Sequence, residues 1–493
     1  MLLGLDLGTG SVKALLMDTS GSILGEGGAA YPIRSPRPGW AETDPLYWWE
    51  ACIKAVRTAV GEHGADVLAL GLSGQMHGVV LSDAAGRPLR PAVLWADTRS
   101  SGMLDRYRAL DAGLLQVLAN PLATGMAGPT LLWLCQNEPE EYRAARWALQ
   151  PKDWLRLRLT GEALSEPSDA SATLLYEPEA DGWAEAVIEA LGLRGDLLPP
   201  LVASGAPAGA LSAEAADSLG LPVGVTVAAG AGDTAAALLG SGLLKSGPVQ
   251  LTVGTGGQIF STRDNFSPDP NLRTHLYRAA TAATAEPVAL WYSMAAMQNA
   301  GLALVWVRRL LGASWRDVYK EAFSVPPGAG GVTFLPYLSG ERTPHLDPEA
   351  RGAWLGLGLD HERGHLLRAA LEGVAFALRE GLEALEEAGV EASELRLAGG
   401  GTLREPWRKL LSDVLGRPLR PLPDEVAGNA SARGAALLAG LTAGVYATAA
   451  ATLELAPELG PGLPPGNDAA AYDAPYARYK QLYPRLYGRD EPV

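Results

Sequence analysis

Cysteine is scarce in this sequence, since 493 residues include only two, Cys52 and Cys135. They stand far apart in apolar, helix-like surroundings and form no Cys-x-x-Cys pair, which argues against a disulfide framework or a thiolate metal cluster. Residues 1–4 carry no basic segment and lead directly into an apolar strand pattern, so we do not expect export. We therefore expect a protein of the reducing cytoplasm.

Basic runs and long apolar runs are missing as well. Forty Lys and Arg residues against fifty-five Asp and Glu give a net charge of −15, and no basic cluster exists that would neutralise a phosphate backbone. The charge-free window 434–453 is long enough to span a membrane, but it consists mainly of Ala, Gly and Thr. We expect a buried helix followed by a loop there, and neither a nucleic-acid nor a membrane partner.

The order of predicted elements indicates an α/β protein that is too long for one core. Turn chemistry predicts an antiparallel meander with strands at 2–7, 12–18 and 22–31. Asp44 and Pro45 then start a helix, and a short strand at 66–71 runs into a Gly-Leu-Ser-Gly segment. Strands and helices alternate in the rest of the chain.

Two short stretches echo each other across half the chain. Residues 5–10 read Leu-Asp-Leu-Gly-Thr-Gly, and residues 251–256 read Leu-Thr-Val-Gly-Thr-Gly. Glycine permits positive φ and lets backbone N–H groups approach an anionic ligand closely, so each turn suits a phosphate. A single turn of this kind is also common in ordinary hairpins. The pairing favours two phosphate-facing turns in one cleft.

Further echoes follow in the same order in both halves. Residues 248–260 restate the opening strand-turn-strand, a strand at 394–397 leads into three glycines, and 433–438 resembles 233–238. We therefore predict two similar α/β lobes, residues 1–245 and 246–493, with a nucleotide and a second substrate in the cleft between them. The second lobe includes a helical tail. Two unrelated α/β domains are the alternative.

Several longer blocks resemble one family. They read Gly-Leu-Asp-Leu-Gly-Thr at 4–9, Gly-Gln-Met-His-Gly at 74–78, Leu-Trp-Ala-Asp-Thr-Arg at 94–99, Pro-Lys-Asp-Trp at the start of 151–161, and Leu-Ser-Gly-Glu-Arg-Thr-Pro at the end of 334–344. With a further signature at 352–372, they resemble the FGGY-type carbohydrate kinases, and within them the xylulokinase branch of these actin-like ATPases. The resemblance covers nearly the whole chain.

This resemblance implies a fold and an activity. The fold is α/β, with two similar ribonuclease-H-like (actin-like) lobes around a central cleft. The activity is ATP-dependent phosphorylation of the terminal hydroxyl of a pentulose, with D-xylulose converted to D-xylulose 5-phosphate. ATP and Mg²⁺ are the implied cofactors, and the small-molecule partners are the sugar and ATP. A homodimer stays open.

Two aspartates are the implied catalytic residues, because phosphoryl transfer needs a metal near the phosphates and a base at the attacking hydroxyl. Asp6 ends a strand beside the first turn, where its carboxylate suits Mg²⁺, although it also suits local turn amides. Asp233 lies between an apolar strand and an Ala-rich helix, and the family position implies the base. From the pattern alone Asp233 is also a favoured helix N-cap, and both roles can coexist.

The implied sugar contacts are Met76 and His77 together with Asp233 and Thr234. His77 can donate to or accept from a hydroxyl, whereas a lone Met-His pair more often packs in a core. Asp97 and Arg99 either add polar contacts or form an internal ion pair that shapes the pocket.

The implied nucleotide contacts come from the two turns and from the glycine triplet. The triplet precedes a predicted helix at 405–415, although such triplets also occur in plain loops. The implied contacts are Thr9, Gly10, Ser11, Thr255, Gly256, Gly399, Gly400 and Gly401.

The chain departs from the family pattern at two positions. Thr234 replaces the usual amide after the catalytic aspartate, which puts the sugar preference in doubt, and Thr130 replaces a signature lysine. A kinase for D-ribulose or another ketose therefore stays open. From another class, a non-catalytic sugar- or nucleotide-binding protein of the same fold, or a filament-forming or chaperone-like ATPase, is the alternative.

One motif points elsewhere. The segment from His361 to His365 matches the zinc-protease pattern His-Glu-x-x-His, which needs both histidines on one face of a stable helix and a third ligand. Gly364 weakens such a helix, Asp360 resembles a cap just before one, and no third ligand follows. We expect no zinc here.

Overall fold

Two mixed β-sheets organise the protein. The computed structural model describes residues 1–280, 290–400 and 404–488. The first sheet has the order β11 (Pro207–Ala210), β12 (Thr226–Ala228), β5 (Ala69–Gly74), β1 (Leu2–Leu7), β2 (Ser11–Met17) and β3 (Ile23–Ala30), with β13 (Ala231–Gly232) also paired to β5. The second has the order β16 (His275–Arg278), β17 (Trp291–Met297), β15 (Gly257–Arg263), β14 (Val249–Val253), β20 (Leu395–Ala398) and β21 (Leu419–Pro421).

The internal repeat is confirmed in strand order and direction. In the first sheet β1 pairs antiparallel with β2 and parallel with β5, and β12 continues parallel to β5. In the second sheet β14 pairs antiparallel with β15 and parallel with β20, and β21 continues parallel to β20. The two halves are therefore similar lobes, and the alternative of two unrelated α/β domains is wrong.

Most predicted elements fall within one to three residues of those observed. The meander at the N-terminus is confirmed, and Asp44 caps α1 (Pro45–Val60) by accepting a hydrogen bond from Leu46 N. The strand expected at 66–71 is Ala69–Gly74 instead, because 61–66 coils as a 3₁₀ turn. This shift places Ser73 inside the strand beside β1.

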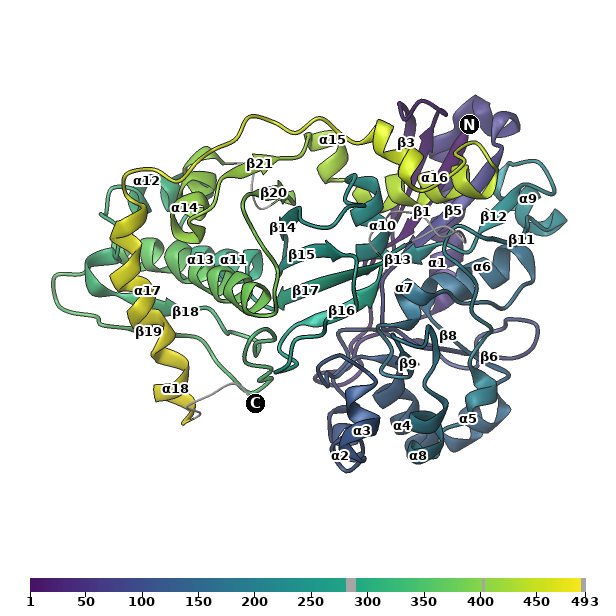
Figure 1. Cartoon of the computed structure of the whole chain (residues 1–493), viewed down its shortest axis with the longest axis horizontal. Coiled ribbons are helices and arrows are strands. Elements are labelled where there is room, and N and C mark those ends of the chain that lie inside the picture. The colour runs from purple at the N-terminus through teal and green to yellow at the C-terminus, as the bar shows by residue number, and fades with distance from the viewer. Residues whose placement is uncertain (281–289, 401–403, 489–493) are drawn as a thin grey trace.

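One helix from the second half packs on the first sheet. Helix α16 (Ala430–Thr442) packs against β1, β2 and β5, near which it is labelled in Figure 1. Its backbone approaches so closely that a Cβ on Gly4 would lie 2.0 Å from the carbonyl oxygen of Ala432, and one on Gly71 would lie 1.9 Å from that of Ala435. The buried helix expected within 434–453 is confirmed.

Helix α10 (Asp233–Gly240) packs against α16, and together they join the lobes. A Cβ on Gly434 of α16 would lie 1.9 Å from the carbonyl oxygen of Ala236 in α10. One hydrophobic cluster contains Leu2 of the first sheet, Leu238 of α10, Leu437 of α16 and Tyr292 of the second sheet. The two segments that echo each other in sequence thus meet at the centre of the molecule.

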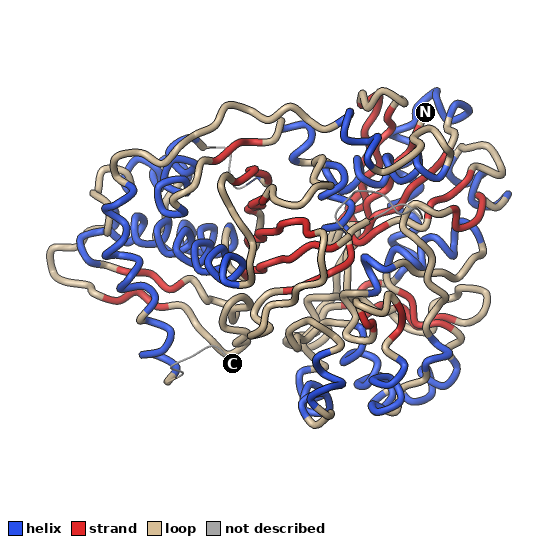
Figure 2. Tube along the Cα trace, viewed as in Figure 1, coloured by secondary structure: helices blue, strands red, loops and turns tan. Residues whose placement is uncertain are grey.

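The other elements surround the two sheets, with helices on the outside and strands inside (Figure 2). Between β5 and β12 the chain forms small sheets and short helices: β6 (Val80–Ser82), β7 (Ala92–Val93), α2 (Leu104–Arg108), α3 (Ala112–Gln116), α4 (Ala127–Asn137), α5 (Pro139–Ala144), β8 (Trp147–Leu149), α6 (Pro151–Thr160), α7 (Pro167–Ala170), β9 (Tyr176–Glu177), β10 (Gly182–Trp183), α8 (Glu185–Leu191) and α9 (Ala213–Leu219). Strand β4 (Glu42–Thr43) pairs with β7.

The second lobe is built around a long helix, α13 (Arg363–Glu387), which contacts β15, β17 and β18. Its other elements are α11 (Gly301–Leu310), α12 (Trp315–Ala322), β18 (Thr333–Leu335), β19 (Ala353–Leu355), α14 (Glu405–Leu415), α15 (Asp424–Ala427), α17 (Asp473–Lys480) and α18 (Leu482–Tyr487). Buried tyrosines of the last two helices, Tyr476, Tyr479 and Tyr483, dock this tail onto the second core. Among the described residues, no helix is long and apolar enough to cross a membrane.

Candidate active site between the two sheets

A cavity of about 220 Å³ lies where the carboxyl ends of the central strands β1 and β14 meet. The first half contributes Asp6, Lys13 and Asp233 to its wall, and the second half contributes Thr252 and Gln258. Parallel strands bring their carboxyl ends to one edge of a sheet, which is where α/β proteins commonly bind ligands. The cavity therefore joins both repeats in one site.

Asp6 is held by its neighbours in the first sheet. Because β5 runs parallel to β1 in this register, Ser73 lies beside Asp6, and its Oγ donates a hydrogen bond of 2.7 Å to Asp6 Oδ1. On the other side β2 pairs Asp6 with Lys13, whose Nζ donates to the carbonyl oxygen of Gly428 at 2.5 Å. Burial raises the pKa of Asp6, while the Ser73 hydrogen bond and the Lys13 charge oppose the rise.

The sequence reasoning missed Lys13 and Ser73. A tight turn at Gly8–Gly10 fixes the hairpin register, and that register alone pairs position 6 with position 13. The contact of Ser73 with Asp6 depends on the parallel register of β1 and β5, and no local sequence pattern fixes that register.

Asp233 occupies the first turn of α10 and faces the same cavity. The residue at the N-cap is Gly232, so the expectation that Asp233 caps this helix is wrong. Its Oδ1 instead accepts from Thr234 N at 2.6 Å and from Thr234 Oγ1 at 3.2 Å. Burial, reinforced by the negative charge of Asp6, raises the pKa of Asp233 to about 7.

His77 is fixed on both its backbone and its ring. Its φ of 73° lies in the left-handed region, a strained conformation for a side-chain-bearing residue. Its N–H donates to Gln150 Oε1 at 3.0 Å, and Nδ1 lies 2.6 Å from the carbonyl oxygen of Ala172. A carbonyl only accepts, so Nδ1 carries the proton. Burial lowers the pKa of His77 to about 4, which leaves Nε2 with a free lone pair at neutral pH.

Met76 and Thr234 are both buried, and each contacts protein atoms in addition to any ligand that it faces. Met76 is 5% exposed, its side chain packs under Gly232, and its Sδ accepts a long contact of 3.9 Å from the hydroxyl of Tyr292. Thr234 lines the cavity, but its hydroxyl donates to Asp233. The other departure, Thr130, is buried within α4.

The first turn holds Thr9 in place and leaves Gly10 open. Thr9 Oγ1 accepts from Trp95 Nε1 at 2.9 Å, and Ser11 begins β2. None of Gly8, Gly10, Gly254 and Gly256 has a positive φ, so these turns do not use the left-handed conformation that glycine permits. A Cβ on Gly10 would meet no described atom within 4 Å. The glycine therefore provides space for a ligand.

The second turn is anchored to the following helix. The carbonyl oxygen of Thr255 accepts from Leu302 N of α11 at 2.9 Å, and a Cβ on Gly256 would lie 2.6 Å from the carbonyl oxygen of Met297. Gly399 and Gly400 follow β20, the strand beside β14, and Gly399 has a φ of 94°. Gly401 lies outside the described residues.

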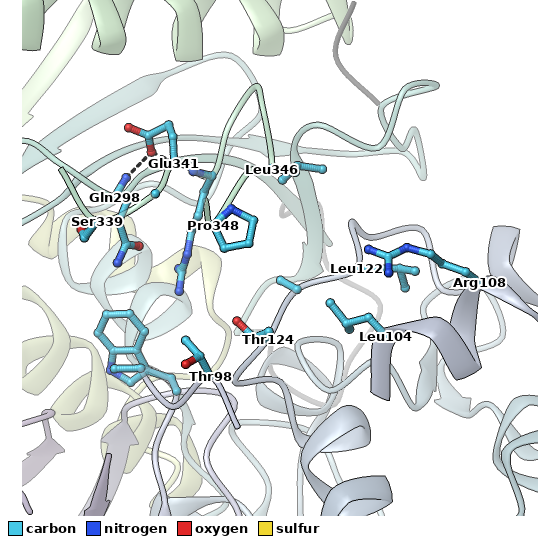
Figure 3. Close-up of a pocket in the computed structure, with 15 residues that line it drawn as sticks. Thr98, Leu104, Arg108, Leu122, Thr124, Gln298, Ser339, Glu341, Leu346 and Pro348 are labelled. Atoms are coloured by element: carbon cyan, nitrogen blue, oxygen red, sulfur yellow. Dashed lines mark hydrogen bonds between the residues drawn. The ribbon is translucent and has the colours of Figure 1, made fainter. Parts of the chain in front are cut away.

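A second pocket of about 150 Å³ also lies between the lobes (Figure 3). Thr98 and Thr124 line it from the first half, and Gln298, Ser339 and Glu341 face them from the second. Glu341 Oε1 accepts from Gln298 N at 2.5 Å, and burial raises the pKa of Glu341 to about 8.

This second pocket borders the first turn, and its Arg342 acts electrostatically on His77 in residues 74–78, which we call the sugar loop. Trp95, which donates to Thr9, lines the pocket, and the guanidinium carbon of Arg342 lies 5.2 Å from the centre of the Trp95 ring. Among the described residues Arg342 has no carboxylate within ion-pair distance. After burial, its positive charge is the other influence that lowers the pKa of His77. A cation on the wall of this pocket therefore influences the neutral His77 imidazole.

Asp97 and Arg99 form an internal ion pair, which is one of the two roles that the sequence left open for them; the other was polar contact with the sugar. The side chains of both are 1% exposed, and Arg99 Nη2 lies 2.7 Å from Asp97 Oδ2 and 2.8 Å from Glu42 Oε1. Asp97 also accepts from Ala41 N at 2.6 Å, and Arg99 stacks 3.6 Å over the ring of Trp40. This pair supports the wall behind the second pocket.

The His-Glu-x-x-His segment does not form a two-histidine helix face. Helix α13 begins at Arg363 with Glu362 as its cap, so His361 lies before the helix and the expected cap Asp360 is wrong. His361 Nδ1 accepts from Gly358 N, and His365 Nδ1 accepts from Glu362 N. No cluster of three or more His, Cys, Asp or Glu side chains able to hold a metal occurs within the described ranges.

Comparison with known proteins gives one consistent family. Two family models match in succession: the N-terminal domain of the FGGY family of carbohydrate kinases over residues 1–240, and its C-terminal domain over residues 249–443. The chain is 36% identical over 421 residues to the xylulose kinase of Escherichia coli strain K12, covering 85% of this chain and 86% of that protein.

Two more relatives agree. The chain is 33% identical over 444 residues to the xylulose kinase of Bacillus subtilis strain 168, with 89% and 87% covered. The crystal structure of the xylulose kinase from Rhodospirillum rubrum matches with a TM-score of 0.88 at 29% identity, over 99% of each chain. The likeness thus extends through both sheets and the cavity between them.

Proposed function

This chain belongs to the FGGY family of carbohydrate kinases, and from that premise we propose that it transfers the γ-phosphoryl group of ATP to the terminal hydroxyl of D-xylulose. The products are D-xylulose 5-phosphate and ADP. The observation that carries the proposal is the pair Asp6 and Asp233, two carboxylates from different elements that face one cavity between two matched sheets.

Asp233 is the proposed general base. A base works best when its pKa lies near the working pH, and burial together with Asp6 holds the pKa of Asp233 at about 7. The carboxylate takes the proton of the sugar hydroxyl as the hydroxyl oxygen forms its bond to the γ-phosphorus. The bond from that phosphorus to the bridging oxygen breaks, and ADP leaves with the electron pair.

Mg²⁺ fits the Asp6 side of the cavity. Asp6 presents a carboxylate whose one oxygen is already oriented by Ser73, and hard oxygen donors of this kind suit Mg²⁺, which retains several waters. Two carboxylates facing one cavity repel each other, a cost that a divalent cation relieves. When bound, the metal supplies charge neutralisation at the phosphates. Asp6 is the residue proposed to hold it.

The sugar is proposed to lie between His77 and Arg342, at the junction of the sugar loop and the second pocket. The neutral His77 offers Nε2 as an acceptor for a hydroxyl, and Arg342 offers donors that no described carboxylate occupies. Met76 shapes the floor from beneath Gly232. Thr234 acts on Asp233 through its hydroxyl and contacts the sugar beside it.

The nucleotide is proposed to lie along the two turns and the second sheet. Thr9, Gly10 and Ser11 offer backbone and hydroxyl groups to the phosphates from the first lobe, and Thr255 and Gly256 do so from the second. Gly399 packs against the backbone of Val253, and Gly400 beside it leaves space for the adenosine at the end of β20. The proposed lobes are residues 1–245 and 246–493, and we propose the cytoplasm, where ATP is plentiful, as the compartment.

One assay tests this function against its rivals. Purified protein is given ATP, Mg²⁺ and a panel containing D-xylulose, D-ribulose and other ketoses, and ADP release is followed. The proposal requires the highest kcat/KM with D-xylulose, and loss of transfer in Asp233→Ala with nucleotide binding retained. Preference for D-ribulose supports the rival that Thr234 keeps open. Binding of both ligands without sugar phosphate identifies a non-catalytic binding protein.

A further inference from the structure

Five charged side chains are buried together directly behind the sugar loop and Asp233. Lys152 Nζ lies 2.6 Å from Asp153 Oδ1, 3.2 Å from Glu166 Oε1 and 3.1 Å from Asp169 Oδ2, and Arg156 Nη1 lies 3.0 Å from Asp153 Oδ1. Each of these side chains is at most 1% exposed. We refer to Lys152, Asp153, Arg156, Glu166 and Asp169 as the buried charge cluster.

Stability alone is a weak reason for such a cluster. Removing five charged groups from water costs several kcal/mol for each ion, and apolar replacements of buried ion networks often leave a protein equally stable or more so. The residues around the cluster, such as Trp154 and Leu155, already form an apolar core. We therefore ask which backbone segments and side chains the hydrogen bonds of the cluster hold in place.

The cluster forms hydrogen bonds to the segment that precedes the proposed catalytic aspartate. Arg156 Nη1 donates to the carbonyl oxygen of Ala229 at 2.5 Å. At the other end of that segment Gly232 N donates to Ser168 Oγ at 3.1 Å, and the same Ser168 hydroxyl donates to Glu166 Oε1 at 2.9 Å. Gly232 directly precedes Asp233, so this chain of hydrogen bonds ends one peptide away from the proposed base.

A third connection fixes the middle of the segment. Gly230, which has a φ of 89°, donates its N–H to the carbonyl oxygen of Ser204 at 3.0 Å. The hydroxyl of Ser204 in turn donates to Glu166 Oε2 at 2.8 Å. Three backbone groups in four residues are thus bound to the cluster or to serines that it orients.

The same elements also hold His77. Gln150, the N-cap of α6, accepts from His77 N, and Ala172, just after α7, accepts from the His77 ring. A Cβ on Gly74, at the start of the sugar loop, would lie 2.9 Å from the Cβ of Lys152. Residues in or beside the two helices that carry the cluster therefore bind both Gly232, which precedes the proposed base, and His77, the proposed sugar contact.

We propose that the buried charge cluster positions Asp233 against the sugar hydroxyl, with Lys152 holding Glu166 and Asp169 together and Ser168 transmitting their geometry to Gly232. Both are positioning residues, since neither faces the cavity. The inference rests on the proposed function of Asp233 as base. It assigns to the block 151–161 a role that packing alone does not require.

Ser168→Ala is the sharpest test, because it removes one hydroxyl and leaves every charge of the cluster in place. Misplacement of a reacting group by a fraction of an ångström lowers turnover strongly, so we expect kcat with D-xylulose, ATP and Mg²⁺ to fall by roughly 10- to 100-fold. The KM for ATP should stay within about twofold, because the hydrogen-bond partners described for Ser168 are Glu166, Ser171 and Gly232 and none of them belongs to the nucleotide turns. Lys152→Met, the larger disruption, should lower kcat at least as much.

The matched controls lie in the second lobe. Ser412 is a fully buried serine whose hydroxyl donates to two backbone carbonyls, and Arg368 forms a buried ion pair with Glu372. Ser412→Ala and Arg368→Met should lose comparable thermal stability while keeping kcat. Equal loss of kcat in Ser168→Ala and Ser412→Ala, or an unchanged kcat in Ser168→Ala, overturns the positioning role.

Asp233→Asn in the same assay separates this inference from the function on which it rests. An inactive Asp233→Asn beside a fully active Ser168→Ala overturns the positioning role and leaves the base intact. A fully active Asp233→Asn overturns both. An inactive Asp233→Asn with a selective fall of kcat in Ser168→Ala supports both.

Discussion

The two Gly-Thr-Gly turns occupy equivalent places in equivalent sheets, yet their neighbours differ at every chemically important position. Asp6 pairs with Lys13 on β2 and with Ser73 on β5. The matching triplet in the second sheet is Thr252, paired with Gln258 on β15 and with Ala398 on β20. The first triplet holds two ionisable groups and a hydroxyl, whereas the second holds no charge.

This difference shows that the two halves share the backbone geometry of the cleft but not its charged side chains. Both halves keep the strand order that brings their central strands to one cavity, so the geometry of a two-walled cleft is shared. Only the first half carries the carboxylate suited to a metal, and Asp233 and His77 also come from that half. The uncharged second wall is the one that an anionic triphosphate can approach without repulsion.

The largest expected effect comes from exchanging the carboxylate of the first triplet for an amide. Asp6→Asn keeps the shape and the Ser73 contact but removes the charge proposed to hold Mg²⁺, so kcat should fall by about 100- to 1000-fold. Thr252→Val, the matched change in the second triplet, should lower kcat by less than about threefold. ADP release at saturating sugar and ATP measures both, and equal losses in the two variants would break the asymmetry.

Much of this comparison follows from the sequence, and its limits are physical. The echo of residues 5–10 in 251–256 predicts both turns and the similar lobes, because strand-turn-strand signals are local. Pairing between distant strands is not encoded locally. The three-dimensional structure is therefore needed to see that Ser73 donates to Asp6 and that α16 packs on the first sheet.

The buried charge cluster shows the same limit in a different form. The block 151–161 is recognisable as a motif, but only the tertiary structure brings its Lys152 to Glu166 and Asp169. The backbone conformation of the glycine turns is also beyond the sequence, since glycine is compatible with several φ regions and the local pattern does not choose among them.

The second expected effect concerns packing, where the two sheets differ again. Gly71 on β5 allows α16 to touch the first sheet, whereas the equivalent position in the second sheet is Arg396. A methyl group at position 71 would meet the backbone of Ala435, and overpacking of this kind costs about 1–3 kcal/mol or more. We expect Gly71→Ala to lower the unfolding midpoint by several degrees.

Arg396→Ala is the control for this packing difference. It removes hydrogen bonds from the Arg396 guanidinium to the carbonyl oxygens of Ser241 and Gly242, a loss of about 1 kcal/mol. Calorimetry on both variants compares them directly. A smaller loss in Gly71→Ala than in Arg396→Ala would mean that α16 shifts freely on the first sheet.

The third expected effect is a pH dependence of turnover set by Asp233 of the first half. Burial and the charge of Asp6 raise the pKa of Asp233 to about 7, so its carboxylate is ionised above that pH and protonated below it. Because the base must be ionised, kcat should fall about tenfold for each pH unit below 7. His77 cannot cause this limb, since its pKa is lowered to about 4. Burial also raises the pKa of Glu341 to about 8, so Glu341→Gln is the second control. A limb retained in both His77→Asn and Glu341→Gln, measured by ADP release from pH 5 to 9, assigns it to Asp233.

The smallest expected effect tests whether a carboxylate works from either wall. Thr252→Asp places one at the position equivalent to Asp6, where it faces the phosphates without a lysine or serine partner. Repulsion across the solvated cleft should raise the KM for ATP about fivefold, near 1 kcal/mol. In the double variant Asp6→Asn/Thr252→Asp, turnover should stay as low as in Asp6→Asn. Recovery of turnover in the double variant would mean that a carboxylate can hold the metal from either sheet. The position of Asp6 in the first sheet would then not be required by the geometry of the cleft.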